Sequence, residues 1–207
     1  MDFDVATELP ADAGCVAMIV GGRGTGKTTL AKRILGAGAL ANGSVAFNAT
    51  EDVRPDYHGV SEEVHAEFDV GSHAPAIARL LRRRKYGAHF RVEGCARPSA
   101  CVFDGCLDGD AGWQRNLHVR ELFADHKALK LRTVLTFDAV PKLSPFVREN
   151  IDVVFLAGDT ITGRVGRAYE AYGSEAGFST LDAFATALAR LASRPFEFMV
   201  IDCRTGT

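Results

Sequence analysis

Long hydrophobic runs, paired cysteines and an excess of charge of one sign are all missing from this sequence of 207 residues. No apolar stretch approaches the ~18–20 residues of a membrane-spanning helix. The five cysteines are odd in number and lack C-x-x-C spacing, which predicts free thiols in a reducing compartment: Cys15, Cys95, Cys101, Cys106 and Cys203. A net charge of −2 argues against a strongly basic protein that coats nucleic acid, but leaves open nucleic acid held inside a ring.

The chain shows no sign of a targeting segment or of a division into parts. Asp2, Asp4 and Glu8 stand near its beginning without a basic region, so we expect no signal peptide. Its composition, 47% hydrophobic and 24% charged, is that of a globular α/β protein, and neither a linker nor a low-complexity segment interrupts it. We therefore expect one domain over residues 1–207.

The most informative segment is rich in glycine. Residues 21–28 read Gly-Gly-Arg-Gly-Thr-Gly-Lys-Thr, a complete G-x-x-x-x-G-K-[ST] motif (Walker A). The apolar run 16–20 before it is of strand type, and residues 29–35 after it start a helix that Gly36 and Gly38 can end. The alternative is a turn that only connects a strand to a helix. The order of strand, loop and helix favours a phosphate-binding loop.

The residue types of this loop fit the binding of a nucleoside triphosphate. Glycines let successive backbone N–H groups point into one concavity, at which the following helix aims its positive end. Lys27 is expected to reach the β- and γ-phosphates, and the hydroxyl of Thr28 to ligate Mg²⁺. With ATP and Mg²⁺ as cofactors, the expected binding residues are Gly21, Gly22, Arg23, Gly24, Thr25, Gly26, Lys27, Thr28 and Thr29.

Short apolar runs of strand type alternate with helical patterns along the rest of the chain. Strands are expected at 44–48, 90–92, 100–103, 133–136, 152–156 and 196–201, and helices at 74–86, 116–126, 165–172 and 180–191. Ser179 is the expected N-cap of the last helix. The alternation predicts an α/β fold with a doubly wound, mainly parallel sheet. The basic residues 82–85 fit a solvated helix face or a functional basic flank.

Asp104 ends the apolar strand 100–103. A carboxylate at this place holds Mg²⁺ through water in P-loop enzymes, whereas the alternative is an aspartate that caps the next turn. In ATPases whose sheet has an extra strand between the loop and this carboxylate, a second acid follows and activates the attacking water. Here that position is Gly105. Asp108 and Asp110, on the following loop, are candidate substitutes or merely solvated carboxylates.

Two further charged residues are candidates for catalysis. Thr136 and Asp138 end the next strand, where such folds place a polar sensor of the γ-phosphate. Asp138 fits a base for the attacking water or simply the start of a loop, because an aspartate beside a γ-phosphate is repelled unless a metal or a water intervenes. Arg148 fits either a guanidinium that reaches the γ-phosphate of a neighbouring subunit or an internal ion pair with Glu149 or Asp152.

Segments beyond the phosphate loop resemble the genome-packaging ATPases of large DNA viruses (poxvirus and giant-virus type), members of the FtsK–HerA group of P-loop ATPases. The most specific match is Leu-Thr-Phe-Asp at 135–138 followed by Arg-Glu-Asn-Ile-Asp-Val-Val-Phe at 148–155. Further matches lie at 48–51, 102–106, 113, 119–126, 167–172, 184 and 198–202. The resemblance therefore extends over nearly the whole chain.

This resemblance implies a fold, an activity and partners. The sheet would be RecA/FtsK-like, with an extra strand between the Walker A strand and the Walker B strand that ends in Asp104. The activity would be ATP hydrolysis by a homo-oligomeric ring that moves double-stranded DNA into a capsid, with capsid or portal-vertex proteins as partners. The protein would be virus-encoded and would act inside the host cell at the site of virus assembly, or be carried in the virion.

The sequence departs from the family's pattern at three positions. The family usually has Asp-Asp or Asp-Glu where this chain has Asp104-Gly105, Arg-His where it has Asp125-His126, and Gln where it has Asp138. The standard water-activating acid, one arginine and the standard sensor are therefore missing. Losing a positioned base typically costs ~10²–10⁴ in rate. The phosphate loop and Asp104 remain, so we expect nucleotide binding to survive.

Three functions stay open at this level. The first is an ATP-driven DNA-packaging motor subunit. The second is a nucleotide-binding, weakly hydrolytic ring subunit with a structural or regulatory role, which the three substitutions favour. The third is a small-molecule P-loop kinase, for which the length is suitable, although the basic run 82–85 is poorly placed for the Arg-rich lid of such enzymes. A GTPase is disfavoured because no Asn-Lys-x-Asp segment occurs.

Overall fold

The computed structural model describes residues 4–9, 13–36, 43–49, 57, 61–90, 98–109, 111–194 and 196–204. Several residues named above lie outside these ranges: Asp2, Gly38, Cys95, Asp110 and residues 91–92 of one expected strand. The four cysteines that the structure describes are all free, as predicted, with Cys15 and Cys101 buried. Of the helices described, none is both long enough and apolar enough to cross a membrane.

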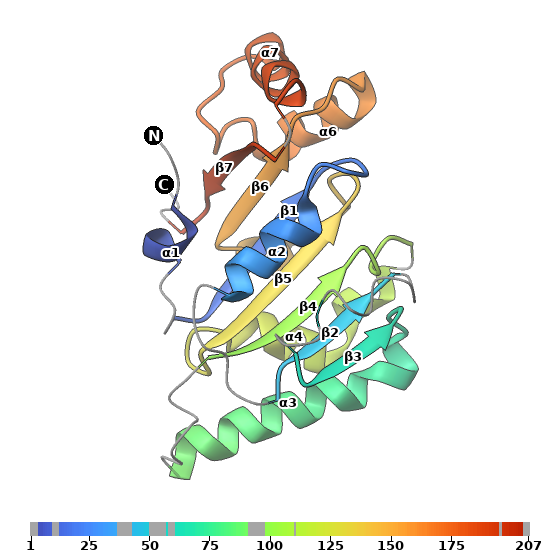
Figure 1. Cartoon of the computed structure of the whole chain (residues 1–207), viewed down its shortest axis with the longest axis vertical. Helices are drawn as coiled ribbons and strands as arrows, with labels where there is room; N and C mark the ends of the chain where they lie inside the picture. Colours follow the sequence, from blue (N-terminus) through green and yellow to red (C-terminus); the bar gives the residue numbers. More distant parts are fainter. Residues whose placement is uncertain are drawn as a thin grey trace.

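A seven-stranded sheet forms the centre of the molecule, with the strand order β3-β2-β4-β5-β1-β6-β7 (Figure 1). The strands are β1 (Cys15–Val20), β2 (Val45–Asn48), β3 (Glu63–Ala66), β4 (Ser99–Asp104), β5 (Leu131–Phe137), β6 (Val153–Ala157) and β7 (Phe198–Asp202). All pairs are parallel except β6 and β7, which are antiparallel. The prediction of a mainly parallel sheet is confirmed, and β5 is the extra strand between β1 and β4.

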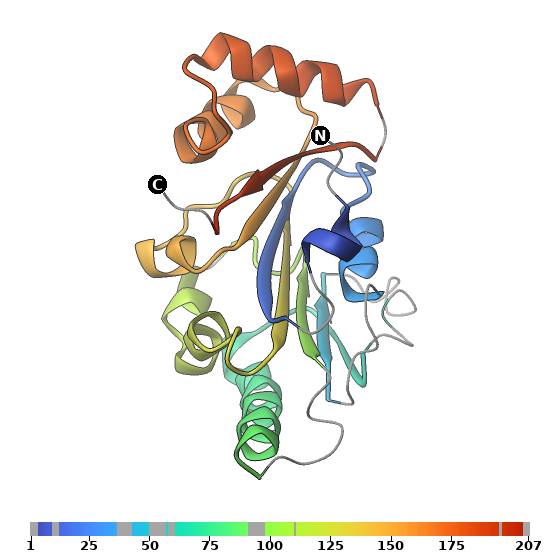
Figure 2. The same cartoon turned by 90° about the vertical axis from the view of Figure 1, so that its left-hand side faces the viewer.

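Helices cover both faces of the sheet (Figure 2). They are α1 (Val5–Glu8), α2 (Lys27–Gly36), α3 (Val70–Phe90), α4 (Leu117–Ala124), α5 (Pro145–Glu149), α6 (Thr162–Tyr172) and α7 (Leu181–Ala192), with a 3₁₀ turn at Ala111–Arg115. The first two lie on one face, and α3, α4 and α5 lie on the other. Because its two faces are both covered, a central strand such as β1 is apolar throughout and fully buried.

The side chains of β1 alternate between two cores. Val16, Met18 and Val20 belong to the core beneath the helices that follow β2, whereas Ala17 and Ile19 belong to the core beneath α1 and α2. The phosphate loop therefore leaves a strand that is fixed from both sides.

The structure corrects the sequence prediction at several element boundaries. Phe90 is the last residue of α3 and not the start of a strand. Thr180, and not Ser179, is the N-cap of α7, because Thr180 has extended backbone and its hydroxyl accepts the N–H of Ala183 at 3.3 Å. The edge strand β3 was not predicted, because its residues are only half-buried and lack an apolar pattern.

The basic residues of α3 form ion pairs with acidic side chains around the helix. The ion pairs are Arg79–Glu63, Arg83–Glu62, Lys85–Glu121 and Lys85–Asp125. Arg84 is buried and donates through Nε to the carbonyl of Leu129 at 2.8 Å. In Figure 1, α3 runs away from the phosphate loop at the far end of the sheet. Arg79, Arg83 and Lys85 are therefore paired with acidic residues around the helix, and the helix does not form a lid over the phosphate loop.

A buried carboxylate ties the amino ends of the strands together. Asp152 Oδ2 accepts the N–H of Val16 at 2.9 Å and lies 2.9 Å from Nε2 of His126, which is also buried. Burial opposes the charged form of Asp152, but hydrogen bonds from His126, Val16 and Lys127 outweigh it and lower the pKa of this carboxyl. His126 is therefore a structural residue at the edge opposite the phosphate loop.

We expect the contact between α7 and the chain that leaves β6 to depend on Gly158. A Cβ on Gly158 would lie 2.0 Å from the backbone N of Ala192 and 2.3 Å from the carbonyl carbon of Leu191. Gly158→Ala should therefore lower the free energy of unfolding by about 1–3 kcal/mol, as overpacking does. Gly163→Ala, in α6, is the control, because a Cβ there has nothing within 4 Å. Urea unfolding measures both; equal stability of the two variants would contradict this packing.

Candidate functional site

The candidate site lies at the carboxyl ends of the central parallel strands. The register pairs Val20 with Phe137 and Asp104 with Thr136, so β1, β4 and β5 end at one level. The loops that follow these strands therefore meet, although they are far apart in the sequence. This is the edge where open α/β sheets bind ligands.

The phosphate loop has the backbone that its glycines predict. Gly24 and Gly26 have φ of 81° and 95°, in the left-handed region. Gly21 has no room for a side chain, since a Cβ there would lie 2.5 Å from Cβ of Ala157. The hydroxyl of Thr25 closes the loop by donating to the carbonyl of Gly22 at 2.9 Å, and α2 begins at once after it. The loop thus forms a concavity at a helix N-terminus, which fits a polyphosphate.

Lys27 lies in this loop and already has three hydrogen-bond acceptors. Its ammonium donates to the carbonyls of Gly21 at 2.7 Å and Gly22 at 3.2 Å, and to Oδ1 of Asp138 at 2.7 Å. The side chain of Lys27 is 13% exposed and that of Asp138 is 61% exposed. Asp138 thus pairs with the ammonium that is expected to reach the phosphates, a contact that the sequence analysis did not predict.

Asp104 is buried and accepts hydrogen bonds from three hydroxyl groups. Oδ2 accepts from Thr28 at 2.8 Å and from Tyr57 at 2.8 Å, and Oδ1 accepts from Thr136 at 2.5 Å. The hydroxyl of Thr136 also accepts the N–H of Gly105 at 2.9 Å. The expected metal pair, Thr28 and Asp104, is therefore assembled.

This pair fits Mg²⁺ chemically. Mg²⁺ is usually held by one or two carboxylates or hydroxyls together with substrate phosphates, and keeps several waters, so a full protein cage is not required. Among the described residues no group of three or more His, Cys, Asp or Glu side chains gathers as a metal cage. Thr28 and Asp104 thus offer one hydroxyl and one carboxylate next to the phosphate loop, a set that suits a phosphate-bound Mg²⁺.

The position after Asp104 is shaped for glycine. Gly105 has φ of 66°, so any other residue there is strained even though a Cβ would meet only Cβ of Ala49, at 3.5 Å. Asp108 lies further along the same loop. Partial burial and the negative charge of Asp138 raise the pKa of Asp108, while a backbone hydrogen bond from Asp138 and the charge of Lys27 act against them. Asp108 is thus electrostatically coupled to Lys27 and Asp138, as a general base would be.

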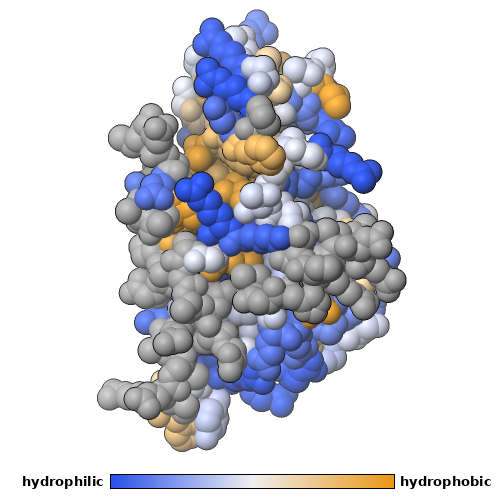
Figure 3. All heavy atoms as spheres, in the orientation of Figure 1, coloured by the Kyte–Doolittle hydropathy of each residue, from blue (hydrophilic) through white to orange (hydrophobic). Residues whose placement is uncertain are grey.

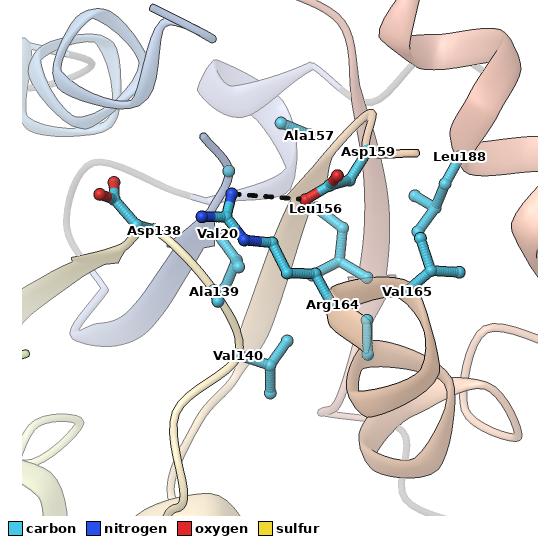
Figure 4. Close-up of a pocket in the computed structure, with 12 residues that line it drawn as sticks. Val20, Asp138, Ala139, Val140, Leu156, Ala157, Asp159, Arg164, Val165 and Leu188 are labelled. Atoms are coloured by element: carbon cyan, nitrogen blue, oxygen red, sulfur yellow. Dashed lines mark ion pairs between the residues drawn. The ribbon is translucent and has the colours of Figure 1, made fainter. Parts of the chain in front are cut away.

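Arg164 is a cation of this site that the sequence analysis did not identify. It lies in the first turn of α6, and a Cβ on Gly22 would be 3.7 Å from its Nη1. Figure 4 shows its guanidinium extending along the wall of a pocket towards Asp138, with Asp159 beside it. The Arg164–Asp159 pair is long, 3.8 Å. The sequence carried no local motif around Arg164, and only the parallel pairing of β6 with β1 brings it to the phosphate loop.

Arg148 and Asp125 lie away from this site within the chain. Arg148 lies in α5, and Asp125 is the C-cap of α4. Both residues are near the amino ends of the strands, at the edge opposite the phosphate loop. The guanidinium of Arg148 contacts the carbonyl of Ala171 and Oε1 of Glu175, the latter at 3.0 Å. The internal partner is thus Glu175, and not Glu149 or Asp152 as one alternative predicted. Arg148 also lines a surface hollow of about 700 Å³; a role at a neighbour's phosphate stays a prediction.

Comparisons with known proteins identify the fold. No family model and no curated protein sequence matches the chain. Its structure is similar to the DNA-packaging ATPase B204 from Sulfolobus turreted icosahedral virus, with a TM-score of 0.66 and 12% identity over 95% of this chain and 96% of that one.

The structure is also similar to the genome packaging NTPase B204 from Sulfolobus turreted icosahedral virus 2. The complex with sulfate has a TM-score of 0.63 and 15% identity, over 94% of each chain. The complex with ATP-gammaS has a TM-score of 0.61 and 14% identity, again over 94% of each chain. The chain therefore has the fold of a viral genome-packaging NTPase, the kind of P-loop protein that its sequence resembles.

Proposed function

We propose that the chain is an ATP-driven motor subunit that moves double-stranded DNA into a viral capsid. The observation that carries the proposal is the phosphate loop, with Lys27 inside it and the Thr28–Asp104 pair beside it at the carboxyl edge of the sheet. The likeness of fold to viral packaging NTPases and the resemblance in sequence support the same reading.

Nucleotide binding would exchange one partner of Lys27 for another. In the structure its ammonium donates to Asp138. A triphosphate in the loop offers more negative charge and several acceptor oxygens to the same ammonium, so the ion pair is replaced and not simply lost. Mg²⁺ held by Thr28 and Asp104 would neutralise charge on the phosphates. Backbone N–H groups of the loop would bind the remaining phosphate oxygens.

Hydrolysis requires a base for the attacking water, and Asp108 is the candidate that its surroundings favour. It follows the metal carboxylate in the chain, and its raised pKa brings it closer to the working range of a base than an ordinary aspartate. Asp138 is paired with Lys27 and is therefore better suited to holding the lysine before nucleotide binds. Arg164 supplies a cation near the loop, where charge on the transferred phosphoryl group needs stabilising.

The second function, a weakly hydrolytic ring subunit, has one observation in its favour. Gly105 has a left-handed backbone, so the acid that usually follows the metal carboxylate cannot be restored there without strain. If Asp108 does not act as a base, the site binds ATP and turns it over slowly. A nucleotide would then hold the ring together without driving it.

The remaining parts of the proposal concern the assembly. We propose one ATPase domain per subunit, a homo-oligomeric ring, DNA in its centre, and capsid or portal-vertex proteins as partners, at a virus assembly site inside the host cell. Half-buried apolar side chains of β7, at Phe198, Met199 and Val200, support a subunit contact. Figure 3 shows apolar surface around β7, between hydrophilic parts of α7 and α2.

The proposal predicts ATP hydrolysis that double-stranded DNA stimulates. Lys27→Ala should abolish or strongly weaken ATP binding, because the lysine is the one full positive charge of the loop that points at the phosphates. Calorimetry with ATP and Mg²⁺ and a phosphate-release assay with and without DNA measure both steps. ATP binding of a folded Lys27→Ala protein at wild-type affinity would contradict the site. Slow turnover that DNA does not change would favour the second function.

If Asp108 is the base, Asp108→Asn should lower kcat by ~10²–10⁴ without weakening ATP binding. An acid must be ionised to accept a proton, so turnover of the wild type should fall as the pH drops through the raised pKa of Asp108, at a pH above the ordinary value of 3.8. Asp138→Asn is the matched control at the neighbouring carboxylate. Should Asp138→Asn lose turnover while Asp108→Asn keeps it, the assignment of the base would be reversed.

We expect Arg164 to act on the nucleotide bound by its own subunit, and Arg148 to act on the nucleotide bound by a neighbouring subunit. Either alanine variant should lose ~10³ or more in turnover, as happens when an arginine at a transferred phosphoryl group is removed. Arg148→Ala subunits mixed with Lys27→Ala subunits should regain activity, since an intact Arg148 can face an intact Lys27. Arg164→Ala mixed with Lys27→Ala should regain none, because both changes affect the same subunit's own site.

Arg167→Ala, on the exposed side of α6, is the control and should keep wild-type turnover. Recovery with Arg164→Ala would show that Arg164 acts across an interface. An absence of recovery with Arg148→Ala, in rings shown to be mixed, would remove Arg148 from the site.

A further inference from the structure

An exposed aromatic ring lies on the phosphate loop. Phe196, in the turn between α7 and β7, is 64% exposed. A Cβ on Gly26 would lie 2.4 Å from Cδ1 and 3.1 Å from Cε1 of this ring, so the ring edge rests directly against Gly26. Gly26 itself has φ of 95°, and the loop would tolerate no side chain there. The ring of Phe196 therefore contacts the phosphate loop at Gly26.

Burial does not explain why the chain holds Phe196 in this place. Its φ of 65° is in the left-handed region, which is unfavourable for a bulky L-residue. The turn is braced by an ion pair between Arg194 and Glu197 at 3.3 Å and by the bond from the N–H of Arg194 to the carbonyl of Leu191. A strained and exposed phenylalanine on a braced turn indicates a use outside the core.

The sheet order tells which end of a bound nucleotide would reach this ring. Asp104 and Asp138 follow β4 and β5, on one side of β1, and with Thr28 and Lys27 they mark the metal and the terminal phosphates. Phe196 precedes β7, on the other side of β1, and the register pairs Phe198 with Ala157 at the same edge. The α7–β7 turn and the end of β4 flank the loop from opposite sides (Figure 1). The nucleoside would therefore extend towards Phe196.

We propose that Phe196 is the stacking platform for the base of the bound nucleotide. The inference rests on the proposed function, because it needs a nucleoside triphosphate in the loop. An exposed ring presents a π-face, and every nucleobase can stack on such a face. Stacking alone does not distinguish one base from another, so the contact contributes affinity for purine nucleotides in general and little choice between ATP and GTP.

The experiment compares ligands with and without a base. Calorimetry is done with MgATP, MgGTP and magnesium tripolyphosphate, which has the phosphates but no base or sugar. Phe196→Ala should weaken both nucleotides by about 5- to 150-fold, the effect of removing one base-stacking side chain, and leave tripolyphosphate unchanged. Phe196→Trp should keep the affinity. Leu181→Ala, at another exposed apolar side chain at the opposite end of α7, is the control and should change nothing.

Phe196→Trp also gives a direct signal. Trp113 is the only native tryptophan and is buried, so a new exposed indole should change its fluorescence with ATP and not with tripolyphosphate. Unchanged or tighter nucleotide binding by Phe196→Ala would overturn the inference, and so would an equal loss for tripolyphosphate, since the ring would then only shape the loop. Wild-type protein that binds none of the three ligands would overturn the proposed function and this inference together.

Discussion

The bond from the hydroxyl of Thr28 to the carboxylate of Asp104 is the contact on which the rest of the site depends. It joins the loop after β1 to the end of β4, across the extra strand β5 that separates them. Asp104 is buried, and its carboxylate accepts hydrogen bonds from three hydroxyl groups. Burying a carboxylate is costly unless its oxygens accept hydrogen bonds. The hydroxyl of Thr28 and the carboxylate of Asp104 would both be available to a divalent cation that arrives with its phosphates.

The cations of the site, by contrast, are held by aspartates that a nucleotide must replace. Asp138 holds Lys27 at 2.7 Å, and Asp159 lies 3.8 Å from Arg164. These pairs fix the two long side chains near the loop before any ligand binds, which reduces the conformational entropy lost on binding. They also compete with phosphate oxygens for the same donors. The distances indicate that Asp138 competes more strongly than Asp159, so Arg164 is the more readily available of the two cations. This difference also gives Asp138 a physical role at the place where the family that the sequence resembles usually has glutamine.

The sequence was sufficient for the fold and for the part of the site that is local in the chain. The phosphate loop and its flanking strand and helix are contiguous, so their pattern alone predicts their conformation. Asp104 could be predicted because a polar residue that ends a buried strand stands out. Three other residues of the site could not be predicted, because the strand order and not a sequence motif brings them there: Tyr57, Arg164 and Phe196. Arg148 was recognised from the sequence as a candidate, but its ion-pair partner was not. That partner, Glu175, is 27 residues further along the chain, and only the fold brings the two together.

The position of Arg148 constrains how a ring of these subunits would have to be built. The phosphate loop lies at the carboxyl edge of the sheet, whereas Arg148 precedes β6 and lies at the opposite edge. One subunit cannot bring the two together, so an arginine that acts between subunits requires the amino edge of one sheet to face the carboxyl edge of the next. Such an interface uses two different surfaces, so repeating it gives a ring if the rotation between neighbours closes, and never a two-fold dimer. Arg164 needs no such arrangement. The two arginines therefore distinguish two arrangements. With Arg148, the site of one subunit is completed by its neighbour. With Arg164, the site is complete within one subunit, and the ring would serve to hold the DNA.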